Sequence, residues 1–308
     1  MLSVVVNFFN NRREAKRTLH SMTRGYQRDA ASIPFEVIAL DHGSSKPLSE
    51  DEVRAFGPEF RYRFIRTTSV SPLKAINAAC RDAAGEHLLV VVDGAHILSP
   101  GIYRSAQAAF RLFPSAFLAT LPFHLGPKKQ NDSILEGYNQ EAEDALLQKT
   151  GWEQYGYKLY GAAGALSDGS GGWFGCLYES SCWGISKADY FSLGGLDERY
   201  QLPGGGLANL HFFQCALERP DLEYVMLLGE ATFHQVHGGV ASNAPPSKHP
   251  WAQFHEEYTR IRGKPFERVA RKPFFLGRLP QEAFHVAKVS TELGLELWKN
   301  MKQPVRDG

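Results

Sequence analysis

The chain has 308 residues and carries 34 lysines and arginines against 33 aspartates and glutamates, so its formal charge is +1. This balance excludes a general nucleic-acid binder, whose phosphate-facing surface normally gives a basic excess. With 43% apolar and 22% charged residues, global disorder is excluded as well.

Cysteine content and apolar runs predict the compartment. The 4 cysteines form no CxxC pair and lack the density of a disulfide-stapled domain, which favours a reducing environment. The first apolar run, residues 2–9, is too short for a signal peptide. No later run reaches the roughly 18 apolar residues of a membrane span. We therefore expect a cytoplasmic protein without a transmembrane segment.

The first part of the chain alternates between apolar strands and amphipathic helices. Strands are expected at residues 2–9, 35–40, 61–67 and 87–92, and helices at 14–22 and 73–84. This alternation predicts an α/β fold with a mostly parallel open sheet, which binds ligands at the carboxyl ends of its strands. Polar residues at these ends are Asn7, Asp41, Thr67 and Asp93.

The pattern loosens in the second part of the chain. We expect helices at 100–112, 207–217, 251–262 and 281–301, a polar helical stretch at 132–149, and strands at 116–121 and 224–228. The glycine-rich segment 167–173 predicts a mobile loop of the kind that covers sites. Residues 233–239, with two histidines, are also expected to form a loop. We predict one domain over residues 1–245 and a helical C-terminal extension over 246–308.

Five segments, in this order, resemble features of the family-2 glycosyltransferases, which have the GT-A fold. They are residues 2–10, 36–45, 77–86, 91–101 and 193–200. The fourth (Val-Val-Asp-Gly-Ala-His-Ile-Leu-Ser-Pro-Gly) occupies the place of the Asp-x-Asp motif, and the fifth is close to the Gly-Gly-Phe-Asp-Glu signature. The resemblance covers most of residues 2–240. It implies a GT-A-type domain with a nucleotide-binding half, 1–100, and an acceptor half, 101–245.

The resemblance also implies an activity. A sugar would move with inversion from a UDP- or GDP-type nucleotide-sugar donor to a hydroxyl acceptor, in the assembly of surface polysaccharide or another glycan. The residues that would lie along the donor are Asn7, Phe9, Asp41, Lys74, Asn77, Asp93 and Ala95.

One departure from the family concerns the metal. Ala95 stands where the family has the carboxylate that holds a divalent ion on the donor diphosphate, and alanine supplies none of the oxygen ligands that Mg²⁺ or Mn²⁺ prefers. The neighbouring His96 and the late histidines His234 and His237 could join Asp93 instead. A weak, water-rich Mn²⁺ or Mg²⁺ site is one expectation, and no metal at all is the other.

A second departure concerns the base that deprotonates the acceptor hydroxyl. The family's Glu-Asp pair falls here at Ala208 and Asn209, and an asparagine cannot accept a proton. Inverting transfer needs a base, and Glu179 is the first candidate for this role. The weaker alternatives are Asp197, Glu198 and His211. The competing hypothesis is a non-catalytic GT-A-like protein that binds a nucleotide sugar or a partner protein.

Several of these residues have a plainer interpretation. Asp41 and Asp93 each precede a turn that an aspartate side chain can cap, and Glu179 could simply be solvated or paired. The apolar residues of the C-terminal helix could pack on the domain, with contact to a membrane surface or a dimer partner as the alternative.

Overall fold

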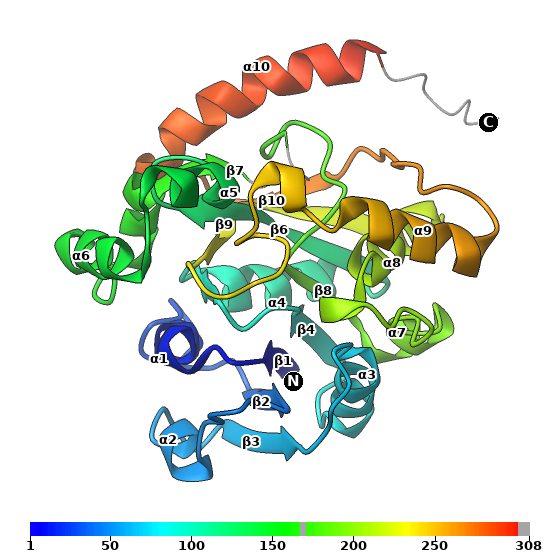
Figure 1. Ribbon diagram of the computed structural model, residues 1–308. Helices are drawn as coiled ribbons and strands as arrows, with labels where there is room; N and C mark the ends of the chain where they lie inside the picture. Colours follow the sequence, from blue (N-terminus) through cyan, green and yellow to red (C-terminus); the bar gives the residue numbers. More distant parts are fainter. Residues whose placement is uncertain (167–170, 301–308) are drawn as a thin grey trace.

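A mostly parallel central sheet with helices on both faces forms the centre of the molecule (Figure 1). The structure is a computed structural model and describes residues 1–166 and 171–300. The strand order is β10-β9-β6-β8-β4-β1-β2-β3, with β5 paired to β9 and β7 paired to β6. The predicted α/β architecture is confirmed.

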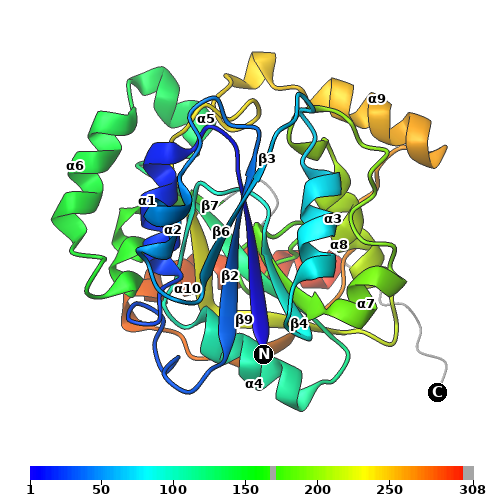
Figure 2. The same ribbon diagram turned by 90° about the horizontal axis from the view of Figure 1, so that it is seen from below.

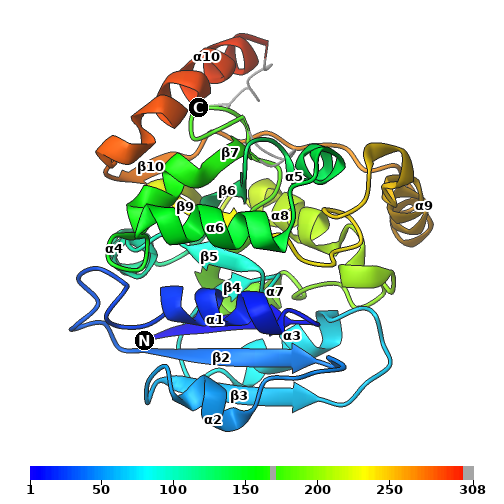
Figure 3. The same cartoon turned by 60° about the vertical axis from the view of Figure 1, so that its left-hand side comes forward.

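The N-terminal part alternates as its sequence pattern predicts. Its elements are β1 (Leu2–Phe8), α1 (Arg12–Ser21), β2 (Phe35–His42), α2 (Glu50–Arg54), β3 (Phe60–Ile65), α3 (Leu73–Asp82) and β4 (His87–Val91). β1 pairs in parallel with both β2 and β4. Figure 3 shows the arrows of β1, β2 and β3 pointing the same way, so their carboxyl ends share one edge of the sheet.

The middle part contains several short elements that its pattern did not predict, among them β5, β7 and α7. Its strands are β5 (His96–Leu98), β6 (Ala116–Leu125), β7 (Ala163–Leu166), β8 (Cys182–Ser186) and β9 (Glu223–His234). Its α-helices are α4 (Ile102–Leu112), α5 (Gln130–Ser133), α6 (Gln140–Thr150), α7 (Lys187–Ser192) and α8 (Ala208–Glu218). The 3-10 helices are η1 (Ile134–Glu136), η2 (Gly156–Ala162) and η3 (Pro203–Gly205).

The end of β9 corrects one expectation. His234 was expected on a loop, but it is the last residue of this strand. The strand passes Gly229, whose φ of +83° suits glycine, and after a register shift it pairs again with β6 as far as His124 and His234. The glycine therefore marks an irregularity inside the strand and does not end it.

The C-terminal part is helical but also adds a strand to the sheet. It contains η4 (Pro246–Lys248), α9 (Trp251–Arg262), β10 (Phe274–Gly277), η5 (Gln281–Ala283) and α10 (Phe284–Asn300). Because β10 pairs in parallel with β9, this part shares the domain's sheet, and the boundary at residue 245 stays a prediction.

Two contacts anchor the C-terminal helices. The Tyr258 hydroxyl of α9 donates to Gln214 Oε1 of α8 over 3.3 Å. Ser290 Oγ of α10 accepts from the backbone N–H of Phe174 over 2.7 Å. Phe174 follows the glycine-rich segment 167–173, whose residues 167–170 lie outside the described part. Among the described residues, no helix has both the length and the apolarity to cross a bilayer. Membrane-surface or dimer contact through α10 stays a prediction.

The sheet separates two hydrophobic cores. Figure 2 shows α1 and α3 on opposite sides of the sheet. α4 shares the first core with α1, and α7 and α8 share the second core with α3. Val4 and Val6 of β1 enter the first core, whereas Val5 between them enters the second. This alternation is the two-residue period of a strand that is buried on both faces. Because apolar cores cover both faces of the strand, the polar groups lie at the carboxyl edge of the sheet.

Candidate functional site

A carboxylate and two imidazoles meet at this edge. Asp93 follows β4, His96 opens β5 and His234 closes β9. The antiparallel pairing of β5 with β9 sets His96 directly opposite His234. One ligand atom from each of the three residues lies within 4.8 Å of the others.

His237, three residues beyond β9, completes the cluster. Its Nε2 lies 3.2 Å from Asp93 Oδ2 and 3.0 Å from His234 Nε2. His234 Nε2 in turn lies 3.4 Å from the same carboxylate oxygen. The structure thus brings together the four predicted metal ligands, Asp93, His96, His234 and His237.

Burial and mutual contact set the charges in the cluster. Burial holds the pKa of His96 well below its ordinary value and also lowers that of His234. At His237 burial opposes the charged form, but the Asp93 carboxylate outweighs it and raises the pKa. Burial would raise the pKa of Asp93, yet His237 and His234 together hold it well below its ordinary value.

Groups behind the cluster fix its orientation. Asp93 Oδ1 accepts from the backbone N–H of Ala95 over 2.9 Å and from Asn11 Nδ2 over 3.2 Å. The residue in the third motif position therefore orients the carboxylate through its backbone. Gln130 Oε1 lies 2.5 Å from His234 Nδ1. Sequence reasoning missed Gln130, which lies in an unremarked polar stretch between β6 and α6.

The cluster fits a divalent metal ion. It offers a carboxylate kept deprotonated by its neighbours and, in His96 and His234, two imidazoles whose burial favours the neutral form, and these are the states that bind metals. His237, whose pKa is raised, would have to release its proton to bind an ion. The Nδ1 of His96 is buried without a hydrogen-bond partner among the described residues. An orphaned buried nitrogen beside other donor atoms is what a metal site without its ion presents.

Glu179 reaches the same edge from the acceptor half. β8 runs antiparallel to β4 with Cys182 opposite Val91, and Val92 N–H donates to Ser181 O over 3.1 Å. The residues just before β8 therefore lie beside those just after β4, where Asp93 follows. Burial raises the pKa of the Glu179 carboxyl, which suits a proton acceptor near neutral pH.

Asn209 holds Glu179 in place. Asn209 Nδ2, at the start of α8, donates to Glu179 Oε1 over 2.9 Å and to Ser180 O over 3.2 Å. Its Oδ1 accepts from the Trp183 indole N–H over 3.0 Å. Asn209, which stands where the family has its base, thus donates a hydrogen bond to Glu179, the candidate base.

The predicted donor contacts differ in their surroundings. Asp41 is buried and caps its own loop, because its oxygens accept from Ser44 N–H over 3.1 Å and from Tyr62 OH over 3.3 Å. This is the turn-capping role expected of an aspartate before Gly-Ser. Contact between Asp41 and the nucleotide-sugar donor stays a prediction. Asn7 Oδ1 is buried without a partner among the described residues. Phe9 and Lys74 are exposed beyond β1 and on α3.

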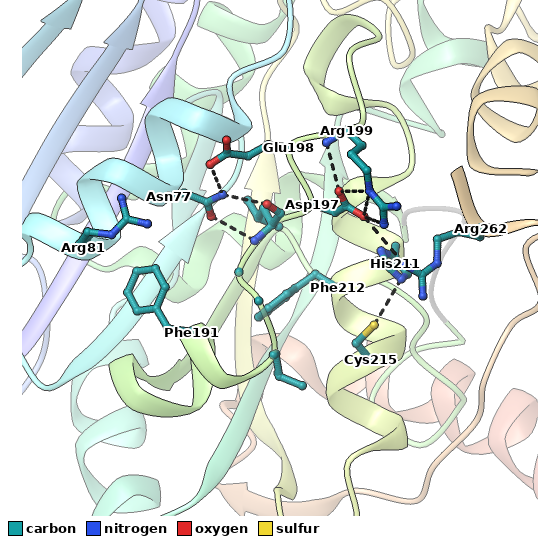
Figure 4. Close-up of a pocket in the computed structure, with 14 residues that line it drawn as sticks. Asn77, Arg81, Phe191, Asp197, Glu198, Arg199, His211, Phe212, Cys215 and Arg262 are labelled. Carbon is teal, nitrogen blue, oxygen red and sulfur yellow. Dashed lines mark hydrogen bonds and ion pairs between the residues drawn. The ribbon is translucent and has the colours of Figure 1, made fainter. Parts of the chain in front are cut away.

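Asn77 and Asp197 line a separate pocket, of about 390 Å³, between α3, α7, α8 and α9 (Figure 4). Asn77 Nδ2 donates to Leu196 O over 2.8 Å and to Glu198 Oε1 over 2.9 Å, so Asn77 holds the loop before α8. Arg199, 2.6 Å away, lowers the pKa of Asp197. A carboxylate with a lowered pKa is a poor base. Burial lowers the pKa of His211, in the same pocket, to about 4.

A second pocket, of about 610 Å³, borders the Asp93 cluster at His237. His237 lines it together with Tyr138, Gln140 and Asn243. The Tyr138 hydroxyl is buried without a partner among the described residues. Gln140, His237 and Asn243 give the wall hydrogen-bonding groups that suit a polar ligand.

Comparison with known proteins finds similarity at the level of the fold. No protein-family profile and no curated protein matches the chain. The crystal structure of Staphylococcus aureus TarS 1–349 with UDP-GlcNAc matches with a TM-score of 0.51 and 16% identity, covering 95% of this chain and 71% of that one. A second crystal structure of S. aureus TarS has a TM-score of 0.49 and 14% identity, covering 98% of this chain and 44% of that one. The first match supports a GT-A-like glycosyltransferase fold.

Proposed function

We propose that the chain is a glycosyltransferase that moves a sugar, with inversion, from a UDP- or GDP-type donor to a hydroxyl acceptor. One observation carries the proposal: β4 and β8 bring the Asp93 cluster and the Glu179 carboxylate to the same edge of a GT-A-like sheet. Transfer needs a base on one side of the anomeric carbon and positive charge on the other. The two groups supply these functions.

In this proposal Glu179 is the base. Its Oε1 accepts from Asn209, whereas its Oε2 has no partner among the described residues. Oε2 would take the proton of the acceptor hydroxyl while the hydroxyl oxygen attacks the anomeric carbon and the bond to the diphosphate breaks. The acceptor would be a glycan or another hydroxyl compound.

The Asp93 cluster lies where the leaving diphosphate would need charge compensation. Held by Asp93, His234 and His237, a divalent ion of the Mn²⁺ or Mg²⁺ kind would offset the charge on the phosphates. His96 belongs to the same cluster. The complex of S. aureus TarS with UDP-GlcNAc makes UDP-sugars the first donors to test.

Donor binding is tested by the melting temperature of the full chain. UDP, GDP and their sugars, each with and without Mn²⁺, should raise it, because a ligand bound by the folded state alone stabilises that state by about 2.7 kcal/mol at a hundredfold excess over its Kd. ADP serves as the control nucleotide. If neither uridine nor guanosine nucleotides shift the melting temperature, the proposal that the chain binds such a donor is wrong.

A second candidate function follows from Ala95 and Asn209, which replace two acids of the family. In that case the chain binds a nucleotide sugar or a partner protein without turnover. Release of UDP or GDP from the donor separates the two functions. Binding with release at background under Mn²⁺ and Mg²⁺ would favour the non-catalytic function.

A further inference from the structure

Two neighbouring residues of α9 hold α8 and the segment that leads into it. Glu257, only 5% exposed, accepts through Oε1 from the backbone N–H of Gln201 over 2.7 Å and from that of Leu202 over 3.2 Å. The next residue, Tyr258, donates to Gln214 Oε1 in the middle of α8. One side of α9 therefore fixes both the approach to α8 and the helix itself.

The segment between Leu202 and α8 has little rigidity of its own. Gly204, Gly205 and Gly206 have φ of +69°, +86° and +53°, and glycine loses more conformational freedom on folding than any other residue. Gly206 also allows the close approach of α9, because a Cβ at this position would lie 2.8 Å from Glu257 Oε2. A segment of this kind depends on hydrogen bonds from its neighbours for a single conformation.

Residues between β3 and α3 hold the same segment. Val70 O accepts from the Gly204 N–H over 3.1 Å, and Ser71 Oγ donates to Tyr200 O over 2.7 Å. Because these residues follow β3, they lie on the carboxyl side of the sheet. The segment therefore links α9 to the side of the sheet on which Glu179 lies.

α8 begins directly after this segment and carries Asn209 in its first turn. Asn209 donates to Glu179 Oε1 over 2.9 Å. Burial raises the pKa of Glu179, and this hydrogen bond offsets part of the rise. A displacement of the start of α8 would weaken the hydrogen bond, and the pKa of Glu179 would then rise further.

We propose that Glu257 is a positioning residue for the candidate base, which fixes residues 201–206 and thereby holds Asn209 against Glu179. In this proposal α9, from the C-terminal part of the chain, helps to build the site. The effect of Glu257 on sugar transfer rests on the proposed function. Its effect on the position of Asn209 does not, because that position can be measured without a donor.

The indole N–H of Trp183 measures the position of Asn209, because it donates to Asn209 Oδ1 over 3.0 Å. In the proton–nitrogen correlation spectrum of the full chain, Trp183→Phe identifies its signal among those of the 5 tryptophans. Glu257→Ala removes the acceptor and Glu257→Asp shortens its reach, so both should move this signal in the direction in which Asn209→Ala moves it. Glu257→Gln keeps an oxygen in the place of Oε1 and should leave the signal unmoved.

The acidic limb of kcat against pH, for release of UDP or GDP from the donor, is the second readout. It should move to higher pH in Glu257→Ala and Glu257→Asp, because a carboxyl that loses a hydrogen-bond donor has a higher pKa. It should stay in place in Glu257→Gln. Glu256→Gln, which changes an exposed acid of the same helix, is the matched control and should alter neither readout.

An unmoved Trp183 signal in the folded Glu257→Ala and Glu257→Asp variants would overturn the proposal. Glu257→Asp keeps the charge of the side chain, so it decides the question if Glu257→Ala does not fold. A moved signal in a chain that releases no nucleotide from any donor would contradict the proposed function and leave the positioning role intact. Release of nucleotide with an unmoved signal would do the reverse.

Discussion

Asn209 donates a hydrogen bond to the carboxylate of Glu179 over 2.9 Å, although 30 residues separate them in the chain. The indole N–H of Trp183 holds the other end of the amide over 3.0 Å. Asn209 is therefore fixed as a donor toward Glu179. This hydrogen bond connects two features that the sequence analysis treated separately. One is Asn209 in place of the family's acid, and the other is Glu179 as the candidate base.

Removing the carboxylate of Glu179 should abolish most of the transfer. Glu179→Gln keeps the size of the side chain but cannot accept a proton, and loss of a general base costs about 10²–10⁴-fold in rate. We expect kcat for donor turnover to fall by this factor, with the KM for the donor little changed. Glu86→Gln, an exposed acid at the opposite edge of the sheet, is the matched control. Full activity of Glu179→Gln would exclude Glu179 as the base.

The pH profile offers a second test of the same pair. Burial raises the pKa of Glu179, and activity should rise with pH as this carboxyl loses its proton. Asn209→Asp replaces a donor by a second carboxylate, and like charges raise the pKa of a neighbouring acid. The acidic limb of kcat against pH should then move to higher pH.

The direction of this shift separates two roles for position 209. If the acidic limb stays in place while activity increases, the introduced aspartate itself acts as the base, as the resemblance implies for this position. Asn209→Ala removes the donor without adding charge and controls for the lost hydrogen bond.

The sheet could be predicted from the sequence because its central strands are short apolar runs, and their order along the chain fixes which polar residues follow them. Asp93, which follows β4, and Asp41, the next-to-last residue of β2, were located in this way. β5 has three residues and pairs with a strand more than a hundred residues away, so local pattern alone does not predict it.

The sequence predicts which residues form the Asp93 cluster but not the residues that support it. The resemblance indicated Asp93 and a late histidine, His234 or His237, and the residue type of His96 added it to them. Gln130 and the donor role of Asn209 depend on hydrogen bonds between distant segments, over separations of 104 and 30 residues. A glutamine or an asparagine carries no signal for such a contact.

Asp41 can be tested for its structural role. Its carboxylate accepts from Ser44 N–H, Leu48 N–H and Tyr62 OH, and Asp41→Asn replaces one acceptor oxygen by a donor. We expect a loss of about 1–3 kcal/mol in the free energy of unfolding, the usual cost of unsatisfied buried polar groups. A melting curve without ligand measures it.

The same variant tests the predicted donor contact. If Asp41 also contacts the base of the donor, Asp41→Asn should in addition raise the Kd for UDP or GDP, measured by titration at a temperature at which the variant is fully folded. Asp51→Asn, in the exposed first turn of α2, controls for the loss of one charge.

A buried acid away from the site predicts a pH-dependent stability. Glu230 of β9 accepts from Ser99 Oγ over 2.5 Å, from Gly101 N–H over 3.0 Å and from Tyr157 OH over 2.8 Å. Burial raises its pKa to about 7, from an ordinary value of 4.5. Because the folded pKa is the higher one, its stabilising contribution is complete below pH 4.5 and is lost as the pH rises through 7.

Tyr157→Phe should therefore destabilise the chain more at pH 8 than at pH 5. It removes a donor to Glu230 Oε1, and an unsatisfied buried acceptor costs about 1–3 kcal/mol, with more for a charged group. Unfolding by urea at the two pH values measures the difference. Tyr155→Phe is the matched control, since that hydroxyl lies 3.5 Å from Glu282 of η5. An equal loss at both pH values would show that Glu230 does not change its charge between them.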